Sequence, residues 1–331
     1  MKYLIPFLLI TRTILADVYH VDASHGDDTS PGSADAPWRS LQHAADRVQP
    51  GDTIRVRAGT YTGLYLETSG TTTQPITITA APGTVITKPN PTTKRDGINL
   101  ELVSHVTIEG FTIRDMPRAG IRAVGIAKRH GTSIVLRDNA CINNGTWGIF
   151  AAFIDDLLIE GNTCNDSRNQ HGIYVSNSGD RPVVRNNVMR GNENCGLHMN
   201  GDVNMGGDGV ITGAVIEGNL ASDNGATGGS TINCDGVQDS VIRHNLVKDA
   251  HASGISLYRI DGGAASTGNL VHGNVVIVAR DGRSAINVQD ASVRNRVIGN
   301  VLVVKNPERA IIDVSRDSRR GFEARGNHEG R

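Results

Sequence analysis

A unit of about 25 residues recurs along most of this 331-residue chain, and this repeat most limits what the chain can fold into. Its clearest mark is an asparagine after an apolar–polar alternation, as in Val215-Ile216-Glu217-Gly218-Asn219. A second mark, a Gly-Ile-like pair such as Gly172-Ile173 or Gly196-Leu197, runs in step with it. A unit this short cannot bury its own apolar face, so it must stack on its neighbours. The repeat asparagines are Asn139, Asn162, Asn187, Asn219, Asn245, Asn274 and Asn300.

The composition of each unit favours a β-solenoid over other repeat folds. Two or three short alternating segments are separated by Gly, Asn or Asp, and none is long enough for a crossover helix. A leucine-rich repeat would need a leucine ladder that is absent here, and propeller blades are longer. The sequence therefore predicts an all-β parallel β-helix with one coil per unit.

The repeat also gives a structural account of the asparagines and cysteines. Stacked asparagines can satisfy the backbone of the next coil, as they do in turns and ladders. Cys141 and Cys164 follow their asparagines by two positions, so we expect stacked neighbours. These two cysteines could form either a disulfide or an apolar pair of free thiols. Cys195 and Cys234 are predicted to be small buried residues.

Composition divides the chain into four parts. Residues 1–16 have a basic start, an apolar run and a small residue before Asp17, which predicts a signal peptide and a secreted or periplasmic protein. The alternative is a wrongly assigned start codon, which Arg12 favours. Residues 17–62 are expected to form an N-terminal cap module, with a helix that places Leu41 and Val48 on one face. Residues 63–315 are the expected parallel β-helix, and residues 316–331 a polar tail outside the repeat. No segment is long enough to span a membrane.

The cap module carries a specific resemblance. The stretch "YHVDASHGDDTSPGSADAPWRSLQHAADRVQPGDTIRVRAGTY", residues 19–61, resembles the N-terminal part of secreted proteins of the pectate-lyase-like superfamily. The coils that follow resemble the right-handed β-helix repeats of that superfamily, so the likeness extends over about residues 17–315. It implies a single-stranded right-handed parallel β-helix in which one sheet forms the floor of a polysaccharide cleft. The superfamily includes lyases, hydrolases, epimerases and adhesins, so the resemblance does not define the reaction.

Alternation within the Gly-Ile strands predicts which side chains face outward. From the fourth coil to the eighth, the outward positions form a strip of flat or short hydrogen-bonding groups without long charged residues, which suits sugar hydroxyls. The loops at 201–209 and 260–266 are expected to wall this strip. The first outward column reads Tyr174, His198, Asn233, Ser256 and Asn287, and the second Ser176, Asn200, Asp235, Tyr258 and Gln289.

The strip supplies the candidate catalytic residues His198, Tyr258 and Asp235. His198 is a candidate base, and Tyr258 a candidate acid or base whose phenol could protonate a leaving glycosidic oxygen. An exposed strand histidine and a sugar-stacking tyrosine are the alternative readings of the two. The candidate substrate-binding residues are His171, Tyr174, Asn200, Asn233, Arg259 and Asn287.

Three aspartates form a candidate metal site for Ca²⁺, the one cofactor we consider. Asp202, Asp235 and Asp261 lie on or beside adjacent coils, and their carboxylates are oxygen ligands that Ca²⁺ prefers. Alternatively, Asp235 and a second carboxylate could hydrolyse a glycosidic bond. Aspartates in turns are commonly structural.

The leading functional expectation is a polysaccharide lyase that cleaves an acidic, uronate-containing polysaccharide by β-elimination. A glycoside hydrolase that uses Asp235, and a non-catalytic glycan-binding protein, are the alternatives. The net charge of −1, with acids and bases interspersed, argues against nucleic acid as a partner. We expect a monomer whose partner is its polysaccharide.

Overall fold

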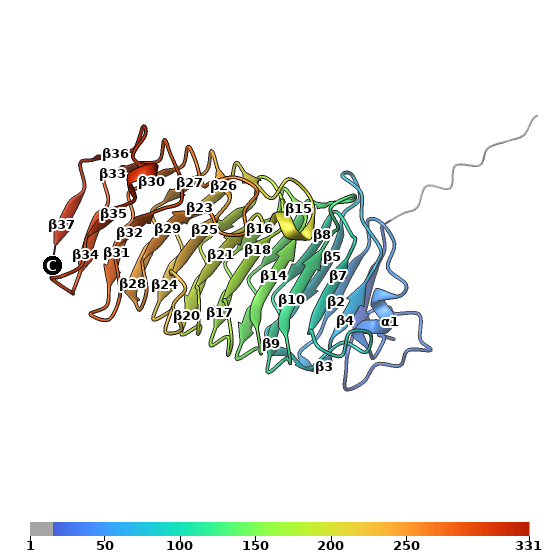
Figure 1. Ribbon diagram of the computed structural model, residues 1–331. Coiled ribbons are helices and arrows are strands. Elements are labelled where there is room, and N and C mark those ends of the chain that lie inside the picture. The colour runs from blue at the N-terminus through green and yellow to red at the C-terminus, as the bar shows by residue number, and fades with distance from the viewer. Residues whose placement is uncertain (1–15, 331) are drawn as a thin grey trace, which may run out of the picture.

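The computed structural model describes residues 16–330, and these wind into a right-handed parallel β-solenoid (Figure 1). Three long sheets of twelve, eleven and ten strands run along its axis, and all their strand pairs are parallel. Each full coil contributes one strand to each sheet in that order. The all-β fold and the coil per repeat predicted from the sequence are confirmed. Within the described residues no helix is long and apolar enough to cross a membrane.

The strands are short because turns interrupt each coil. The twelve-stranded sheet contains β1 (Val18–Val21), β2 (Thr53–Val56), β5 (Ile76–Ala80), β8 (Val106–Glu109), β12 (Ile134–Arg137), β16 (Leu158–Glu160), β19 (Val183–Arg185), β23 (Val215–Glu217), β27 (Val241–Arg243), β30 (Leu270–His272), β33 (Arg296–Ile298) and β36 (Glu323–Arg325). The eleven-stranded sheet contains β3 (Gly59–Thr62), β6 (Thr84–Lys88), β9 (Thr112–Arg114), β13 (Ala140–Ile142), β17 (Thr163–Asn165), β20 (Val188–Arg190), β24 (Leu220–Ser222), β28 (Leu246–Ala250), β31 (Val275–Val278), β34 (Val301–Val304) and β37 (His328–Gly330).

The ten-stranded sheet carries the strip predicted from the sequence. It contains β4 (Leu64–Leu66), β7 (Ile98–Glu101), β10 (Ala119–Val124), β14 (Trp147–Ala152), β18 (Ile173–Ser176), β21 (Leu197–Asn200), β25 (Ile232–Asp235), β29 (Ile255–Tyr258), β32 (Ile286–Val288) and β35 (Ile312–Val314). Two small sheets pair β11 (Gly131–Thr132) with β15 (Ile154–Asp155), and β22 (Ile211–Thr212) with β26 (Val237–Gln238). The helical elements are α1 (Leu41–Ala45) and the 3₁₀ turns η1 (Val203–Met205) and η2 (Arg316–Ser318).

The asparagine stack forms one continuous buried ladder, as predicted. At each step the side-chain oxygen of one asparagine accepts the backbone and side-chain N–H groups of its neighbour in the preceding coil. Asn219, for example, accepts both from Asn187, each at 3.0 Å, and donates its own amide to Val184 O at 2.9 Å. The ladder lies at a turn between two sheets, where strand pairing does not satisfy the buried backbone groups. Because the asparagine side chains satisfy them there, they hold each coil against the next.

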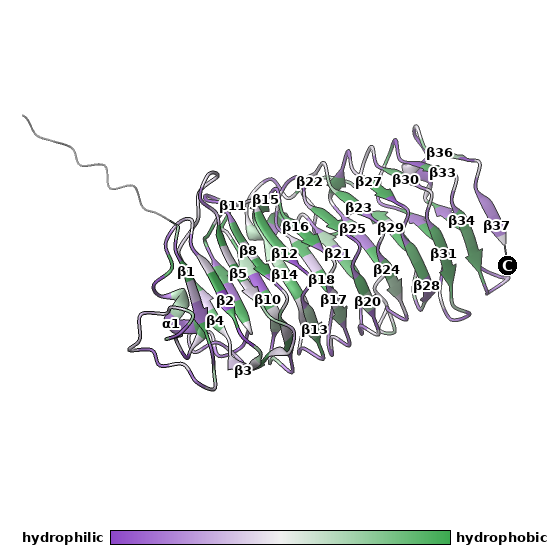
Figure 2. Cartoon of the chain, turned by 180° about the vertical axis from the view of Figure 1, so that it is seen from behind, coloured by the Kyte–Doolittle hydropathy of each residue, from purple (hydrophilic) through white to green (hydrophobic). Residues whose placement is uncertain are grey.

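The core lies inside the coil, where apolar side chains stack from strand to strand. Figure 2 shows hydrophobic residues recurring along the strands and hydrophilic ones in the turns. Cys141 and Cys164 are register partners, both fully buried and both free thiols. The structure therefore has the pair of stacked thiols, one of the two alternatives left open by the sequence. Cys195 and Cys234 are also buried, as predicted.

The cap covers the first coil as predicted, although its helix is short. α1 spans five residues, its N-cap Ser40 accepts the His43 N–H at 3.2 Å, and it buries Leu41 and Ala44 together with Ala45. Figure 1 places α1 at the N-terminal end of the solenoid. Residues 1–16, predicted as a signal peptide, lie outside the described residues except for Ala16.

The β-helix extends beyond the boundaries of 63 and 315 expected from the sequence. β1, β2 and β3 of the cap module already pair with later strands. At the other end β36 and β37 pair with β33 and β34, so residues 316–330 form part of a last coil and not a separate tail. Parallel pairing uses only backbone groups, so polar strands can continue a sheet, and Asn327 extends the asparagine ladder by accepting from Asn300.

Removing one rung of the ladder should destabilise the whole solenoid. Asn219→Ala would leave the N–H groups of Asn187 and the Val184 carbonyl without their buried partner. We expect a loss of about 2–4 kcal/mol in the free energy of unfolding, since each unsatisfied group costs about 1–3 kcal/mol. Urea denaturation measures it. Asn204→Ala removes an exposed asparagine side chain and should leave the midpoint unchanged. An equal midpoint for both variants would contradict the role of the ladder.

Candidate active site

The ten-stranded sheet brings the predicted outward residues into two straight columns. Tyr174, His198, Asn233, Ser256 and Asn287 are successive register partners in the first column. Ser176, Asn200, Asp235 and Tyr258 are successive partners in the second. Because parallel strands stack in register, residues far apart in sequence lie about 4.8 Å apart here. The alternation and register predicted for this strip are confirmed.

Much of the strip is buried, whereas the sequence suggested an open floor. The loops at 201–209 and 260–266 hold each other, with Val203 N–H donating to Asp261 O at 2.9 Å and Gly263 N–H donating to Gly209 O at 2.8 Å. Gly209 has a φ of +72°, and a Cβ there would lie 2.6 Å from Gly263 N, so only glycine fits. Asn200 and Asp235, the second-column residues next to these loops, are 3% and 1% exposed.

Asp235 is an anchor for the 260–262 turn. Its two carboxylate oxygens accept four contacts at 2.8–3.1 Å from the backbone N–H groups of Ile260, Asp261 and Gly262. Burial raises the pKa of this carboxyl, and the backbone donors oppose that effect. These bonds occupy the carboxylate, so Asp235 does not face a substrate as the predicted catalytic acid or nucleophile should.

The structure does not bring Asp202, Asp235 and Asp261, the residues of the predicted Ca²⁺ site, together as one group of metal ligands. Among residues 16–330, these three carboxylates do not form a group whose oxygens all lie close enough to share one ion. Asp202 caps the turn η1 by accepting the Asn204 N–H at 3.2 Å, and the Asp235 oxygens face N–H groups, whose positive ends repel a cation. The acids of this region hold loops in place, as turn aspartates commonly do.

Tyr258 is the centre of a side-chain network that joins four coils. Its phenol oxygen accepts the Asn233 side-chain N–H at 2.7 Å and lies 3.4 Å from His198 Nε2. His198 Nδ1 lies 3.2 Å from His171 Nε2, and His171 Nδ1 accepts the backbone N–H of Cys195 at 3.2 Å. The Tyr174 ring stacks on His198, with 4.9 Å between ring centroids and 10° between planes. Four predicted residues thus converge around Tyr258.

The Cys195 backbone N–H determines the tautomers along this chain. Since it donates to Nδ1 of His171, the proton of neutral His171 must sit on Nε2, from which it donates to His198 Nδ1. The proton of neutral His198 then sits on Nε2 and points at the phenol oxygen of Tyr258. These assignments follow from the hydrogen bonds. Tyr258 therefore receives two N–H donors, and its own proton is left for another acceptor.

The pKa shifts agree with these neutral tautomers. Burial lowers the pKa of His198 to about 4 and that of His171 well below its usual value, so both rings are uncharged near neutral pH. Burial, followed by the negative charge of Asp235, raises the pKa of the Tyr258 phenol above its ordinary value. In the folded protein this tyrosine is therefore protonated at neutral pH, with two donors placed to receive negative charge on its oxygen.

His171, Cys195 and His198 also have donor atoms within 4.8 Å of one another, a spacing that could hold a metal ion. The hydrogen bonds argue against that use. His171 Nδ1 is already an acceptor for the Cys195 N–H, so coordination through Nε2 would require an anionic imidazolate. The Cys195 thiol is buried, and burial raises its pKa, which disfavours the thiolate that binds metals. The cluster fits a hydrogen-bond relay better than a metal centre.

A groove of about 490 Å³ opens beside Tyr258 and continues toward the C-terminal coils. Asn233, Tyr258 and Asn287, all predicted substrate-binding or catalytic residues, line it. Four other predicted site residues do not line this groove: His171, Tyr174, His198 and Asn200. Arg259 is exposed at the edge and is not a lining residue.

Two lining arginines, Arg283 and Arg309, were missed by the sequence analysis. Arg283 donates to the Gly228 carbonyl at 2.6 Å, a contact that leaves its positive charge available in the groove. Both arginines lie three residues before a strand of the ten-stranded sheet, Arg283 before β32 and Arg309 before β35. That shared position was the available signal. The groove thus combines a phenol and amides with two arginines and with the carboxylates of Asp290, Glu308 and Asp313.

Comparisons with known proteins agree with the fold. Residues 19–165 match the family model described as "Pel9A-like, right handed beta helix region". Over 78 residues the chain is 36% identical to pectate lyase PEL9 of Emericella nidulans, a stretch that covers 23% of this chain and 18% of that protein. The chain therefore spans less than a fifth of this curated relative.

Three solved structures share the solenoid at low sequence identity. An alginate lyase from Paenibacillus sp. has a TM-score of 0.62 and 17% identity, covering 87% of this chain and 96% of that one. Pectate lyase Pel9A has a TM-score of 0.60 and 16% identity, with coverages of 94% and 79%. A GH136 lacto-N-biosidase from Eubacterium ramulus has a TM-score of 0.56 and 15% identity, with coverages of 95% and 68%. Together with the repeat and the cap, these findings show that the chain has the right-handed parallel β-helix fold and that its residues 19–165 match a Pel9A-like β-helix region.

Proposed function

We propose that this protein is a polysaccharide lyase that cleaves a uronate-containing polysaccharide by β-elimination in the groove beside Tyr258. The observation that carries the proposal is the phenol oxygen of Tyr258, which receives donors from Asn233 and His198 at the wall of a groove lined by Arg283 and Arg309. A phenol placed this way can exchange protons with a sugar, and the arginines can bind its carboxylate.

Tyr258 can perform both proton transfers of the elimination. Its phenolate removes the proton from the carbon α to the uronate carboxyl, which forms the phenol O–H bond and leaves the electron pair as an enolate. That pair then forms the carbon–carbon double bond while the bond to the leaving glycosidic oxygen breaks. The leaving oxygen takes the proton from the phenol, so Tyr258 returns to the phenolate and all atoms and charges balance.

Asn233 and His198 stabilise the phenolate that begins and ends this cycle. Hydrogen bonds to a charged oxygen are stronger than those to a neutral one, so both donors favour the ionised phenol more than the protonated one. Arg283 and Arg309 supply the positive charge that the enolate needs. His171 does not contact Tyr258 but holds His198 in the tautomer that donates to the Tyr258 oxygen.

The comparisons support a carbohydrate-acting protein and include lyases of pectate and alginate, but a hydrolase shares the fold too. Hydrolysis normally uses two carboxyl groups that flank the scissile bond. Asp235, the candidate for that role, is committed to the 260–262 turn. Asp290, Glu308 and Asp313 also line the groove, so hydrolysis by a pair of these carboxylates is the second candidate. The two donors on the Tyr258 phenol oxygen favour elimination. A polysaccharide substrate is also consistent with our proposals of export and of a monomer.

Removing the phenol oxygen of Tyr258 should slow turnover strongly while the groove still binds its ligand. For Tyr258→Phe we expect the rate to fall by about 10²- to 10⁴-fold, the usual contribution of general acid–base catalysis. The assay is the ultraviolet absorbance of the unsaturated uronate formed from pectate and from alginate. Tyr19→Phe makes the same change in the first coil and should keep full activity. New reducing ends without the absorbance would instead indicate a hydrolase.

Activity should rise with pH, because the reaction begins from the phenolate. The pKa of Tyr258 is raised above its ordinary value near 10, so the ionised fraction increases about tenfold per pH unit from about pH 7 to about pH 10. We expect kcat/KM to follow that increase in the wild type, and the residual rate of Tyr258→Phe to lack it. A profile that is flat or falls over this range would assign Tyr258 the acid step alone.

The relay predicts a specific tautomer of His198. Two-dimensional ¹H–¹⁵N spectra of the side chains should show its proton on Nε2. His171→Gln retains an amide donor for His198 Nδ1 and should keep that tautomer, whereas His171→Leu removes the donor. In the leucine variant we expect mixed tautomers and a rate lower by about 10- to 100-fold, the worth of one hydrogen bond to a charged group. A proton on His198 Nδ1 in the wild type would rule out this relay.

A further inference from the structure

A row of partly exposed aromatic rings lies on the outward face of the ten-stranded sheet, on the N-terminal side of Tyr258. Trp147 stacks on Phe150 with ring centroids 4.5 Å apart and 23° between planes. The edge of Tyr174, one coil further, meets Phe150 at 5.3 Å. The Trp147 Nε1–H donates to Gln170 at 2.8 Å, so the polar edge of the indole already has a partner. We call Trp147, Phe150 and Tyr174 the aromatic platform.

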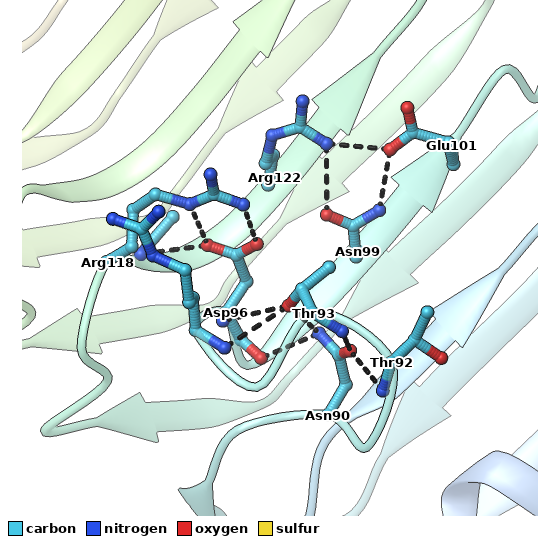
Figure 3. Close-up of polar contacts among 10 residues, drawn as sticks. Asn90, Thr92, Thr93, Asp96, Asn99, Glu101, Arg118 and Arg122 are labelled. Carbon is cyan, nitrogen blue, oxygen red and sulfur yellow. Dashed lines mark hydrogen bonds and ion pairs between the residues drawn. The ribbon is translucent and has the colours of Figure 1, made fainter.

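A polar group borders this platform on the side away from the groove. Figure 3 shows Arg122 turned toward Glu101 and Asn99, with the Arg122 guanidinium 2.7 Å from Glu101 and 3.2 Å from Asn99. The Arg122 and Glu101 side chains are 20% and 24% exposed, so their remaining donors and acceptors can meet a ligand. The Arg122 guanidinium also lies 6.0 Å from the Phe150 ring centroid.

This polar group is held in place by a second pair on the same sheet. The Arg118 guanidinium forms two bonds with the Asp96 carboxylate, at 2.8 and 2.5 Å, and the Asp96 side chain is fully buried (Figure 3). The same carboxylate accepts the backbone N–H of Ala119 at 3.2 Å. These contacts fix the start of β10, from which Arg122 projects, so the polar border is rigid.

The platform is unusual for this chain. Its 13 aromatic residues are 4% of the sequence, and the only other tryptophan, Trp38, is 4% exposed beneath the cap. Core packing explains Trp38 but not Trp147, which points away from the core. Phe150 stacks on the Trp147 ring, which remains partly exposed. A partly exposed ring with a satisfied polar edge and polar neighbours is suited to the apolar face of a sugar.

We propose that the aromatic platform, with Arg122, Glu101 and Asn99, is a second sugar-binding subsite for a pyranose ring of the same polysaccharide chain. The inference rests on the proposed function, because the platform continues the strip that leads to Tyr258. From β14 to β29 there are four strand steps, roughly 19 Å, so one chain of several sugars can occupy both places. The subsite binds by stacking and by hydroxyl contacts, and its occupation favours long substrates over short ones.

Tryptophan fluorescence and calorimetry can test this without turnover. The full chain carrying Tyr258→Phe would be titrated with hexasaccharides and disaccharides of galacturonate and of mannuronate, and with neutral cellohexaose. We expect a hexasaccharide to change the emission, because Trp147 is the only tryptophan near the strip. In Trp147→Ala the Kd for that hexasaccharide should rise roughly tenfold, and the Kd for the disaccharide should stay the same. Leu246→Ala truncates an exposed apolar residue on another sheet and should change neither.

The outcomes separate this inference from the proposed reaction. Unchanged emission with a saturating hexasaccharide, together with an unchanged Kd in Trp147→Ala, would overturn the subsite. So would the lack of any response to all the oligosaccharides. A response to cellohexaose alone would keep the subsite and reject an acidic substrate. Binding at Trp147 without unsaturated product from the wild type would keep the subsite and reject β-elimination.

Discussion

The stacking of one coil on the next through backbone hydrogen bonds is the constraint on which the rest of this structure depends. Parallel pairing satisfies the backbone along each strand, but the turns between sheets would leave buried N–H and carbonyl groups unpaired. The asparagine ladder fills that gap at one turn, from Asn139 to Asn327, with a backbone and a side-chain bond at every step. The coils are thereby held in one register over the length of the solenoid.

That fixed register brings the candidate catalytic groups together on a surface built from short strands. Tyr258, Asn233 and His198 come from three successive coils, yet their side chains meet within hydrogen-bond distance. A rigid backbone also allows one amide to influence a distant phenol. The Cys195 N–H selects the tautomer of His171, which selects that of His198, which donates to Tyr258. Each link needs positions accurate to a few tenths of an ångström, which a stacked sheet provides.

The predictions from sequence succeeded where a residue's position within the repeat decides its environment. The two outward columns, the stacked Cys141 and Cys164, and the asparagine ladder all follow from equal offsets in successive units. The predictions failed where the path of a loop decides which partner a side chain has. Asp235 has the right position for a catalytic carboxylate, but the turn at 260–262 folds back and donates three backbone N–H groups to it. Arg283 and Arg309 precede their strands and enter the groove, whereas Arg259, beside Tyr258, remains at the exposed edge.

The sequence by itself determined the coil, the direction in which each strand residue points, and the identity of the polar strip. It could do so because in-register parallel pairing turns a shared offset from the repeat asparagine into contact in space. Only the tertiary structure decided which polar side chains of that strip are hydrogen-bonded within the protein and which line the groove. The paths of the 201–209 and 260–266 loops, and the last coil formed by residues 316–330, depend on contacts between segments of unequal length that no repeat position encodes.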